Sequence, residues 1–289
     1  FWQTGHDDGM EFNINSRQTK DILRGDRAFR PTFNSYMWAD ATALAKISAL
    51  DEDKELEKEY LAIAANLKKQ IQEKLWDPKR NFFFPMSSRE EKDKEGNVVK
   101  AHTLTYQSGK FAGNPHGREL HGYVPWTFNI PDEGYESAWK FLMDPEYFYA
   151  PFGPRTTEVN DPLYVLKTGC CWWSGQSWPF ATAQTLKAMG NLLQFYEQDQ
   201  ISKKDYLTVL HTFAISQRKD GKPYIAEALN PDDGSWRGAA VPTVCCDIRE
   251  FSLAEVSAVD WAGRVAAPPL FFSRPAGARA VPPPACPSF

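Results

Sequence analysis

The residues best suited to chemistry are carboxylates set among aromatic side chains at the start of the chain. Asp7 and Asp8 are adjacent, Glu11 follows after a glycine, and Trp2 precedes them within residues 1–12 (FWQTGHDDGMEF). When burial raises the pKa of one carboxyl group and a neighbour stays ionised, the first can protonate a leaving oxygen. The aromatic rings could hold a sugar. The cluster therefore indicates a sugar-cleaving site, with an acidic surface turn as the alternative.

The same acids fit a second chemistry. An Asp-Asp-x-x-Glu run on a helix places carboxylates one turn apart, which suits the divalent metal and diphosphate chemistry of a terpenoid synthase. Gly9 weakens such a helix, and no second cluster of Asn, Ser and Glu follows along the chain. The sequence thus favours sugar chemistry and predicts neither a metal ion nor a cofactor.

A second carboxylate candidate is Glu227, which stands in a polar stretch with Tyr224 before it and Asn230 after it. A general base must be ionised and aimed at a water molecule, and these neighbours could orient it. The alternative is a solvated loop glutamate.

A tryptophan-rich segment predicts a wall on which a sugar ring could stack. Trp173 and Trp178 flank Gly175 and Gln176, directly before a proline that suits the first turn of a helix. Glycine permits close approach, and a helix N-terminus offers N–H donors to hydroxyl groups. Buried core tryptophans are the alternative.

Polar residues at the start of an earlier helix could hold the hydroxyl groups of the same ring. Arg30, Asn34, Trp38 and Asp40 lie there, and the other face of that helix is apolar. The predicted substrate-binding set is Trp2, Asp8, Glu11, Arg30, Asn34, Trp38, Asp40, Trp173, Gly175, Gln176 and Trp178.

The elements that must position these residues are mainly helices. Apolar residues recur at intervals of three and four in residues 32–50, 51–76, 179–196 and 203–217, which predicts four helices. Asp132 or Glu133 is predicted to begin a further helix that ends at residue 143. Between the helices we expect a turn and a short extended segment at 77–84, a charged loop at 87–100 and a long loop at 144–173. Loops of the latter length often bind ligands.

The order of these elements predicts an all-α fold. The first two helices, joined by a short acidic turn, form a hairpin. Repeated hairpins with elaborate aromatic loops at one end suggest a toroid in which those loops form the site. A helical bundle is the alternative, because both folds are built from antiparallel neighbours.

Composition narrows the range of partners. The 289 residues include ten tryptophans, 42% are apolar, and the net charge is −4 without a long Lys/Arg cluster. These features favour a small carbohydrate ligand over nucleic acid or an anionic membrane. No apolar run reaches the roughly 18 residues of a membrane helix. The chain starts at Phe1 rather than Met, so we expect a fragment of a longer protein.

Two further features carry no chemistry. Cys170, Cys171, Cys245, Cys246 and Cys286 match neither a disulfide framework nor a zinc site, and we expect them to be small buried hydrophobic residues. Residues 239–289 are rich in Ala and Pro without a helical or strand period. We expect a catalytic domain over 1–238, followed by a tail that is disordered or comes from a misread exon or a frameshift.

Four motifs in this order resemble the inverting glycosidases of glycoside hydrolase family 63, especially the mannosylglycerate hydrolase-like branch, with trehalases more distant. Residues 2–8 (WQTGHDD) are similar to Trp-Glu-Ser-Gly-x-Asp-Asn, with Gln3 in place of Glu and Asp8 in place of Asn. Residues 75–84 (LWDPKRNFFF) contain a structural marker of the family. Residues 173–179 (WSGQSWP) are similar to Trp-Arg-Gly-Pro-x-Trp, with a serine replacing the arginine.

The fourth motif, residues 227–231 (EALNP), is similar to Glu-x-Tyr-Asn-Pro. The resemblance covers residues 1–237 and implies an (α/α)6 barrel in which Asp7 is the general acid and Glu227 the general base. It implies an inverting, exo-acting α-glycosidase whose barrel is incomplete at both ends, so the fragment alone can fold poorly or be inactive. The competing hypothesis is a non-catalytic carbohydrate-binding or scaffold protein on the same toroid.

Overall fold

The computed structural model describes residues 1–92, 98–166, 172–219, 222–224 and 227–235. These residues belong to one compact unit, Phe1–Val241. All five cysteines and the tail beyond residue 238 lie outside them. The helices are α1 (Pro31–Leu50), α2 (Lys54–Leu75), α3 (Val124–Thr127), α4 (Pro179–Phe195) and α5 (Lys203–Ser216), with 3-10 helices η1 (Ser16–Gln18), η2 (Leu120–Tyr123) and η3 (Glu136–Phe141). The strands are β1 (Trp2–Gln3), β2 (Ala28–Phe29), β3 (Trp76–Asp77), β4 (Phe82–Phe83), β5 (Met86–Lys92), β6 (Val98–Leu104), β7 (Arg218–Lys219) and β8 (Lys222–Pro223).

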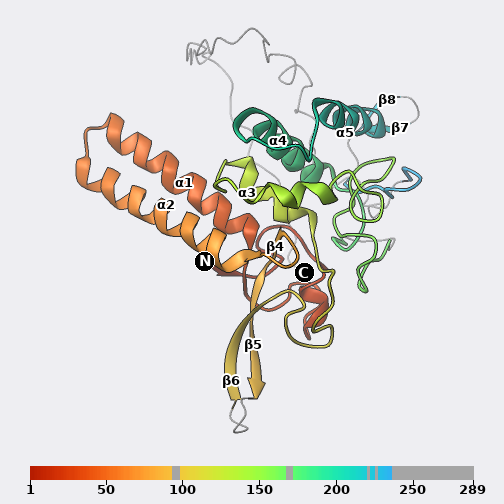
Figure 1. Cartoon of the computed structure of the whole chain (residues 1–289), viewed down its shortest axis with the longest axis horizontal. Coiled ribbons are helices and arrows are strands. Elements are labelled where there is room, and N and C mark those ends of the chain that lie inside the picture. The colour runs from red at the N-terminus through yellow and green to blue at the C-terminus, as the bar shows by residue number, and fades with distance from the viewer. Residues whose placement is uncertain (93–97, 167–171, 220–221, 225–226, 236–289) are drawn as a thin grey trace, which may run out of the picture. The chain divides into compact units, whose positions relative to one another are not determined.

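Helices α1 and α2 form the predicted hairpin and pack along each other (Figure 1). The turn between them is acidic, and Asp53 caps α2 by accepting the Leu56 N–H at 3.0 Å. Glu55 and Glu57 in the first turn of α2 complement the positive end of the helix dipole. Arg30 directly precedes α1, and Asn34, Trp38 and Asp40 lie in its first half, so this hairpin supports residues predicted to bind substrate.

Helices α4 and α5 also confirm their predictions. Pro179 occupies the first turn of α4, and Ala188, Met189 and Leu192 on its inner face are fully buried. Ser202 and Asp205 form a capping box at the start of α5. The two helices lie next to each other, and α3 packs against α4 (Figure 1).

The predicted charged loop at 87–100 was wrong, because the described residues of this stretch, 87–92 and 98–100, lie in two paired antiparallel strands. Strands β5 and β6 pair from Met86↔Leu104 to Lys92↔Val98 and extend a four-stranded sheet in the order β1-β2-β5-β6. Strand pairing is driven by backbone hydrogen bonds and β-branched residues, both of which an emphasis on side-chain charge overlooks. The described chain is therefore rich in helices, as predicted, but is not all-α.

The helix predicted from Asp132 to residue 143 was also wrong over its first turn. Gly134 has φ +104°, which a right-handed helix does not accommodate, and only the 3-10 helix η3 follows it. Asp132 instead accepts hydrogen bonds from Lys68 and Gln72 of α2, at 2.6 and 3.0 Å. This contact holds the turn against the helical hairpin.

Many of the aromatic residues build the core. The Tyr123 ring lies 4.4 Å from Trp139 and 5.1 Å from Phe82, and Trp126 meets Trp139 edge-on at 5.5 Å. All four side chains are at most 1% exposed. Such edge-to-face contacts add to the stabilisation from burial alone. The family marker at residues 75–84 belongs to this core, through the β3–β4 pairing of Trp76 with Phe83.

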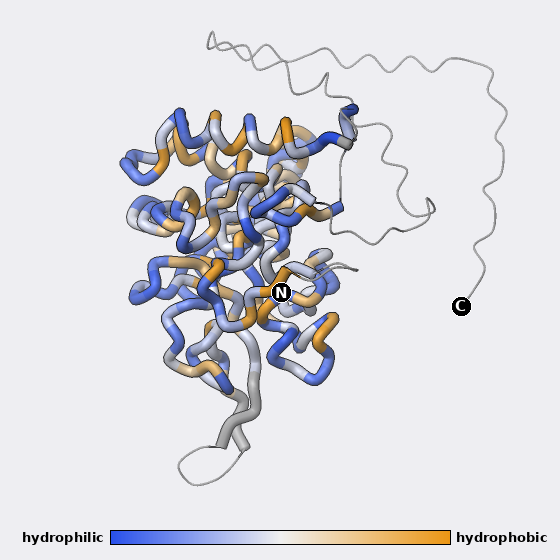
Figure 2. Tube along the Cα trace, turned by 90° about the vertical axis from the view of Figure 1, so that its right-hand side faces the viewer, coloured by the Kyte–Doolittle hydropathy of each residue, from blue (hydrophilic) through white to orange (hydrophobic). Residues whose placement is uncertain are grey.

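Hydrophilic and hydrophobic residues alternate along the helices (Figure 2). Among the described residues, no helix combines the length and apolar character needed to cross a membrane.

The core packing generates a stability test at Gly122. A Cβ there would lie 2.3 Å from the Phe82 ring and 2.7 Å from the Phe83 carbonyl oxygen. We expect Gly122→Ala to lower the free energy of unfolding by about 1–3 kcal/mol or more, measured by urea denaturation.

The matched control is Gly190→Ala in α4, where the nearest atom would be 3.8 Å away. That substitution should raise the free energy of unfolding by about 0.5–1 kcal/mol, because alanine restricts the unfolded chain. Equal effects of the two substitutions would show that the packing around η2 is not as described.

Candidate active site

Asp7 lies on an exposed turn between β1 and β2. The Met10 N–H donates to the Gly5 carbonyl oxygen, and the Gly5 N–H donates to the Arg24 carbonyl oxygen, both at 2.8 Å. Asp7 Oδ2 accepts the backbone N–H and the hydroxyl of Thr4, at 2.7 and 3.0 Å. The backbone hydrogen bond is the main reason that the pKa of Asp7 is lowered. The metal-binding arrangement that needs these acids on a helix is absent from residues 5–12, which form turns.

Asp8, by contrast, points into the protein. Its Oδ2 lies 2.7 Å from Arg30 Nε and also accepts hydrogen bonds from the Thr32 hydroxyl and, at 3.3 Å, from Gln3 Nε2. The side chains of Asp8 and Arg30 are 0% and 1% exposed. Burial acts to lower the pKa of Arg30, but attraction to Asp8 and Glu119 raises it overall. Two residues predicted to bind substrate are thus paired with each other in the interior.

The opening segment lies against the tryptophan-rich segment. The Trp173 N–H donates to the Glu11 carbonyl oxygen at 3.2 Å, and the Ser174 hydroxyl donates to the carbonyl oxygen of Phe12. The Phe12 ring stacks on Trp172 with the ring centres 4.4 Å apart. These backbone and ring contacts hold the opening segment against the tryptophan-rich segment.

The backbone at Gly175 lies close to another group, as a glycine permits, but that group is the protein loop at Tyr164 and Val165. Its φ is +153°, and a Cβ would lie 2.8 Å from the Val165 carbonyl oxygen and 2.9 Å from the Tyr164 ring. Its N–H donates to the Thr156 hydroxyl at 3.0 Å, and the Gln176 carbonyl oxygen accepts the Thr156 N–H at 3.1 Å. Any side chain at position 175 would therefore displace the loop that precedes it.

Trp173 and Trp178 stack on each other, with ring centres 4.4 Å apart and an angle of 18° between the planes. They are 4% and 7% exposed. Trp178 Nε1 donates to the Trp172 carbonyl oxygen at 3.1 Å. In the described chain, these rings therefore serve chiefly to pack the segment.

The loop with Glu227 is attached to the same segment. Ser177 and Leu229 exchange two backbone hydrogen bonds, at 2.9 and 2.8 Å. Arg155, which is 8% exposed, lies 2.7 Å from the Asp232 carboxylate at the end of this loop. Glu227 itself is exposed. The sequence analysis did not include Arg155, whose contact is visible only in the folded chain.

The remaining predicted residues lie around the start of α1. Asn34 Nδ2 donates to the carbonyl oxygens of Phe1 and Arg30, at 3.0 and 2.9 Å. Trp38 is half-buried against the core, and Asp40 is exposed. Trp2 is 38% exposed and lies 4.9 Å from the His102 ring. The contacts of Asn34 and Trp2 are with protein groups.

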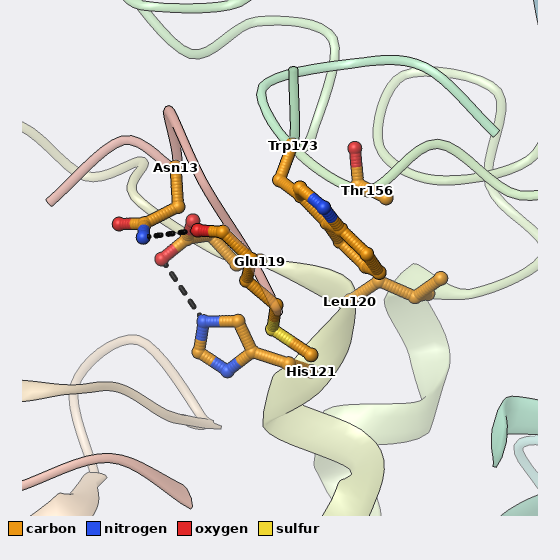
Figure 3. Close-up of a pocket in the computed structure, with 7 residues that line it drawn as sticks. Asn13, Glu119, Leu120, His121, Thr156 and Trp173 are labelled. Carbon is orange, nitrogen blue, oxygen red and sulfur yellow. Dashed lines mark hydrogen bonds and ion pairs between the residues drawn. The ribbon is translucent and has the colours of Figure 1, made fainter. Parts of the chain in front are cut away.

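A small cavity lies between Asn13, Glu119 and Trp173 (Figure 3). Its volume is about 10 Å³, enough for about one water molecule but not for a sugar ring. Its lining comprises Met10, Asn13, Glu119, Leu120, His121, Thr156 and Trp173. This cavity is therefore too small to be the binding site of a sugar.

Glu119 and His121, which were not among the predicted residues, form a buried pair whose Oε2 and Nε2 atoms are 3.1 Å apart. Glu119 also accepts hydrogen bonds from Asn15 Nδ2 and the Ile14 N–H, at 3.0 and 3.2 Å. A glutamate and a histidine in the otherwise apolar residues 119–126 (ELHGYVPW) were the available signal. The described residues contain no group of three potential metal-ligating side chains.

Asp161 is a further buried acid, and burial raises its pKa to about 7. Its Oδ1 accepts hydrogen bonds from the Tyr106 hydroxyl at 2.9 Å and from the Leu163 N–H at 2.7 Å. These bonds favour the ionised form, but the desolvation of the charge outweighs them. Asp161 lies in the loop that supports Gly175, so its protonation is linked to the folding of this loop.

Comparison with known proteins places this geometry in context. The family described as "Mannosylglycerate hydrolase MGH1-like glycoside hydrolase domain" matches residues 2–242. Among solved structures, a chain named "Sialidase" is 34% identical over 83% of this chain, with a TM-score of 0.68. No curated protein matches.

Two structures of a GH63 mannosylglycerate hydrolase from Thermus thermophilus are also similar, one in complex with glucose and one with Tris. They are 14% and 13% identical over 76% of this chain, with TM-scores of 0.51 and 0.52. The chain spans 45% and 43% of these two structures and 20% of the sialidase. It therefore corresponds to a part of each of these proteins.

The buried Asp161 predicts a pH-dependent stability. Between pH 3.8 and about 7, the folded chain keeps a proton that the unfolded chain releases. Rising pH therefore favours unfolding over this range. Asp161→Asn keeps the acceptor oxygen and removes the titration.

We expect the free energy of unfolding of Asp161→Asn, relative to the unaltered protein, to increase from about pH 4 to about pH 7 and then level off. The gain should be a few kcal/mol, at about 1.4 kcal/mol per pKa unit. Urea denaturation at successive pH values measures it. A difference that does not vary with pH would contradict the raised pKa of Asp161.

Proposed function

The chain belongs to the mannosylglycerate hydrolase MGH1-like glycoside hydrolase family, and we propose that it cleaves an O-glycosidic bond with Asp7 as general acid and Glu227 as general base. The proposal concerns the whole protein, of which this chain supplies the two carboxylates. The substrate is a carbohydrate, and the reaction needs no metal or cofactor.

The observation that supports this pair most directly is that the loops of Asp7 and Glu227 are both bonded to residues 173–177. Trp173 is bonded to Glu11, which lies four residues after Asp7, and Ser177 is bonded to Leu229, two residues after Glu227. The carboxylates come from opposite ends of the described chain, yet the segment 173–177 links both loops. Both side chains are exposed, as groups that meet a substrate must be.

In an inverting reaction the acid protonates the glycosidic oxygen while the base activates a water molecule on the opposite face of the sugar. The general acid must keep its proton at the working pH, but the pKa of Asp7 is lowered by the Thr4 N–H. A bound sugar ring that displaces water from the exposed carboxyl group would raise this pKa. The Glu227 side chain is exposed beside the buried residues Ala228 and Leu229, so its carboxylate is open to a substrate and a water molecule.

The substrate class follows in part from Ser174. The related motif has an arginine at this position, whereas Ser174 is fully buried and donates to the Phe12 carbonyl oxygen. A serine in this role offers no positive charge to an acidic substrate. We therefore propose that a neutral glycoside is a better substrate than mannosylglycerate, and that the enzyme cleaves a sugar from the end of the glycan chain.

The described hairpins are proposed to form part of an (α/α)6 toroid, with residues 1–238 as the portion from the catalytic domain. The similarity to the T. thermophilus hydrolase structures supports this arrangement. The toroid would place the loops of residues 1–12, 144–166 and 227–235 at one rim.

A non-catalytic carbohydrate-binding protein is the second candidate. The lowered pKa of Asp7 favours it, because a binding protein can use an ionised carboxylate as a hydrogen-bond acceptor for sugar hydroxyl groups. The two candidates differ in whether the bond is broken, and substitution of the two carboxylates separates them.

We expect Asp7→Asn and Glu227→Gln in the full-length protein each to lower kcat by about 10²–10⁴-fold, because a general acid and a general base contribute on that scale. Binding of the product sugar, measured by calorimetry, should persist in both variants. Hydrolysis is assayed on a panel of α-glucosides, α-mannosides and mannosylglycerate, and NMR of the anomer first released reports inversion.

Matched controls are Asp26→Asn and Glu59→Gln, which remove exposed acids of the same types elsewhere in the chain. They should leave kcat unchanged. Full turnover in both Asp7→Asn and Glu227→Gln would reject the proposed pair, and binding without turnover in the unaltered protein would favour the second candidate.

A further inference from the structure

Arg30 is a cation in the protein interior that depends on one carboxylate. It is 1% exposed, and its Nε lies 2.7 Å from Asp8 Oδ2. Removal of one partner from such a buried pair leaves an uncompensated charge, which is more costly than the loss of a surface ion pair. Glu119 attracts the guanidinium as well, but its own oxygens are bonded to His121, Asn15 and the Ile14 N–H.

Gln3 has an amide side chain that contacts the Asp8 carboxylate of this pair. It is 4% exposed, and its Nε2 donates to Asp8 Oδ2 at 3.3 Å. Among the described residues, neither Gln3 Oε1 nor Asp8 Oδ1 has a hydrogen-bond partner, although both atoms are buried. The Gln3 amide and the Arg30 guanidinium thus both contact the Asp8 carboxylate, and the amide and the carboxylate each retain an oxygen without a hydrogen bond.

These contacts close the turn that carries Asp7. Gln3 belongs to β1 and pairs with Ala28 of the neighbouring strand β2. Arg30 is the residue that follows β2. Asp7 lies between Gln3 and Asp8, and its carboxylate binds Thr4 within the same turn. The turn that carries Asp7 is thus closed by the hydrogen bond between Gln3 and Asp8, and Asp8 is also bonded to Arg30. These bonds set the position of the Asp7 carboxyl group.

We propose that Gln3, Asp8 and Arg30 form a clamp that positions Asp7. The clamp requires one carboxylate to balance the charge of Arg30, and the residue at position 3 or the residue at position 8 can supply it. Gln3 Nε2 already lies 3.3 Å from Asp8 Oδ2, so a carboxylate at position 3 would lie next to the place that the Asp8 carboxylate occupies. Asp8 and Arg30 are then positioning residues and do not bind sugar. The catalytic consequence rests on the proposed role of Asp7, whereas the charge requirement does not.

Four full-length proteins test the clamp: the unaltered protein with one carboxylate, Asp8→Asn with none, Gln3→Glu with two, and Gln3→Glu/Asp8→Asn with one. We expect each single substitution to lower the melting temperature by about 10 °C, because a buried charge is left without balance. The double substitution should restore most of that loss. Losses that add in the double variant would overturn the charge requirement.

Kinetics at a temperature where all four proteins are folded test the positioning role. A displaced acid should lower kcat of Asp8→Asn by about 100-fold, with KM close to that of the unaltered protein. The double variant should recover kcat and the pH dependence of kcat/KM. An increase in KM alone would show that Asp8 binds substrate, and recovery of the melting temperature without recovery of kcat would overturn the positioning role.

Asp77→Asn is the matched control, because Asp77 pairs with Arg80 at 2.7 Å in a similarly enclosed place. It should lower the melting temperature without lowering kcat in the folded protein. Loss of kcat in this control equal to that of Asp8→Asn would also count against a specific role of the clamp. If Asp7→Asn keeps full turnover, the proposed function fails, while the melting temperatures still decide the charge requirement.

Discussion

The arrangement of the candidate site depends on the backbone hydrogen bonds of one short segment, residues 173–177. Trp173 binds the opening segment at Glu11, and Ser177 binds the last described loop at Leu229. Gly175 makes this possible, since only a residue without a Cβ fits against Tyr164 and the Val165 carbonyl oxygen. This segment is thus bonded directly both to the opening segment and to the loop of Glu227.

Environment divides the acids around this segment into two groups. Asp8, Glu119 and Asp161 are buried, and each has a protein partner: Arg30, His121 and Tyr106, respectively. Asp7 and Glu227 are exposed and hold no ion pair among the described residues. The buried acids therefore stabilise the support, and the exposed ones are left to act on a ligand. Adjacent carboxylates such as Asp7 and Asp8 have different roles because the turn directs one outward and the other inward.

The sequence predicted the long helices because their apolar period reflects burial on one side. The pairing of β5 with β6 and the turn at Gly134 were not predicted, because backbone pairing between charged strands and a positive φ leave little trace in the apolar periodicity of the sequence. The candidate acid and base came from motif resemblance. The pairing of Asp8 with Arg30 requires contact across 22 residues, and the pairing of Asn15 with Glu119 requires contact across 104, so neither was accessible from spacing.

The central claim is that Asp7 and Glu227 act together on one glycosidic bond. The most direct measurement is the distance between their carboxyl groups in a crystal structure of the full-length protein with a bound sugar. An inverting pair predicts a separation of about 6.5–9.5 Å, with a water molecule beside Glu227. A separation of about 5 Å would indicate a retaining mechanism, and carboxyl groups that do not face the same sugar ring would contradict the account.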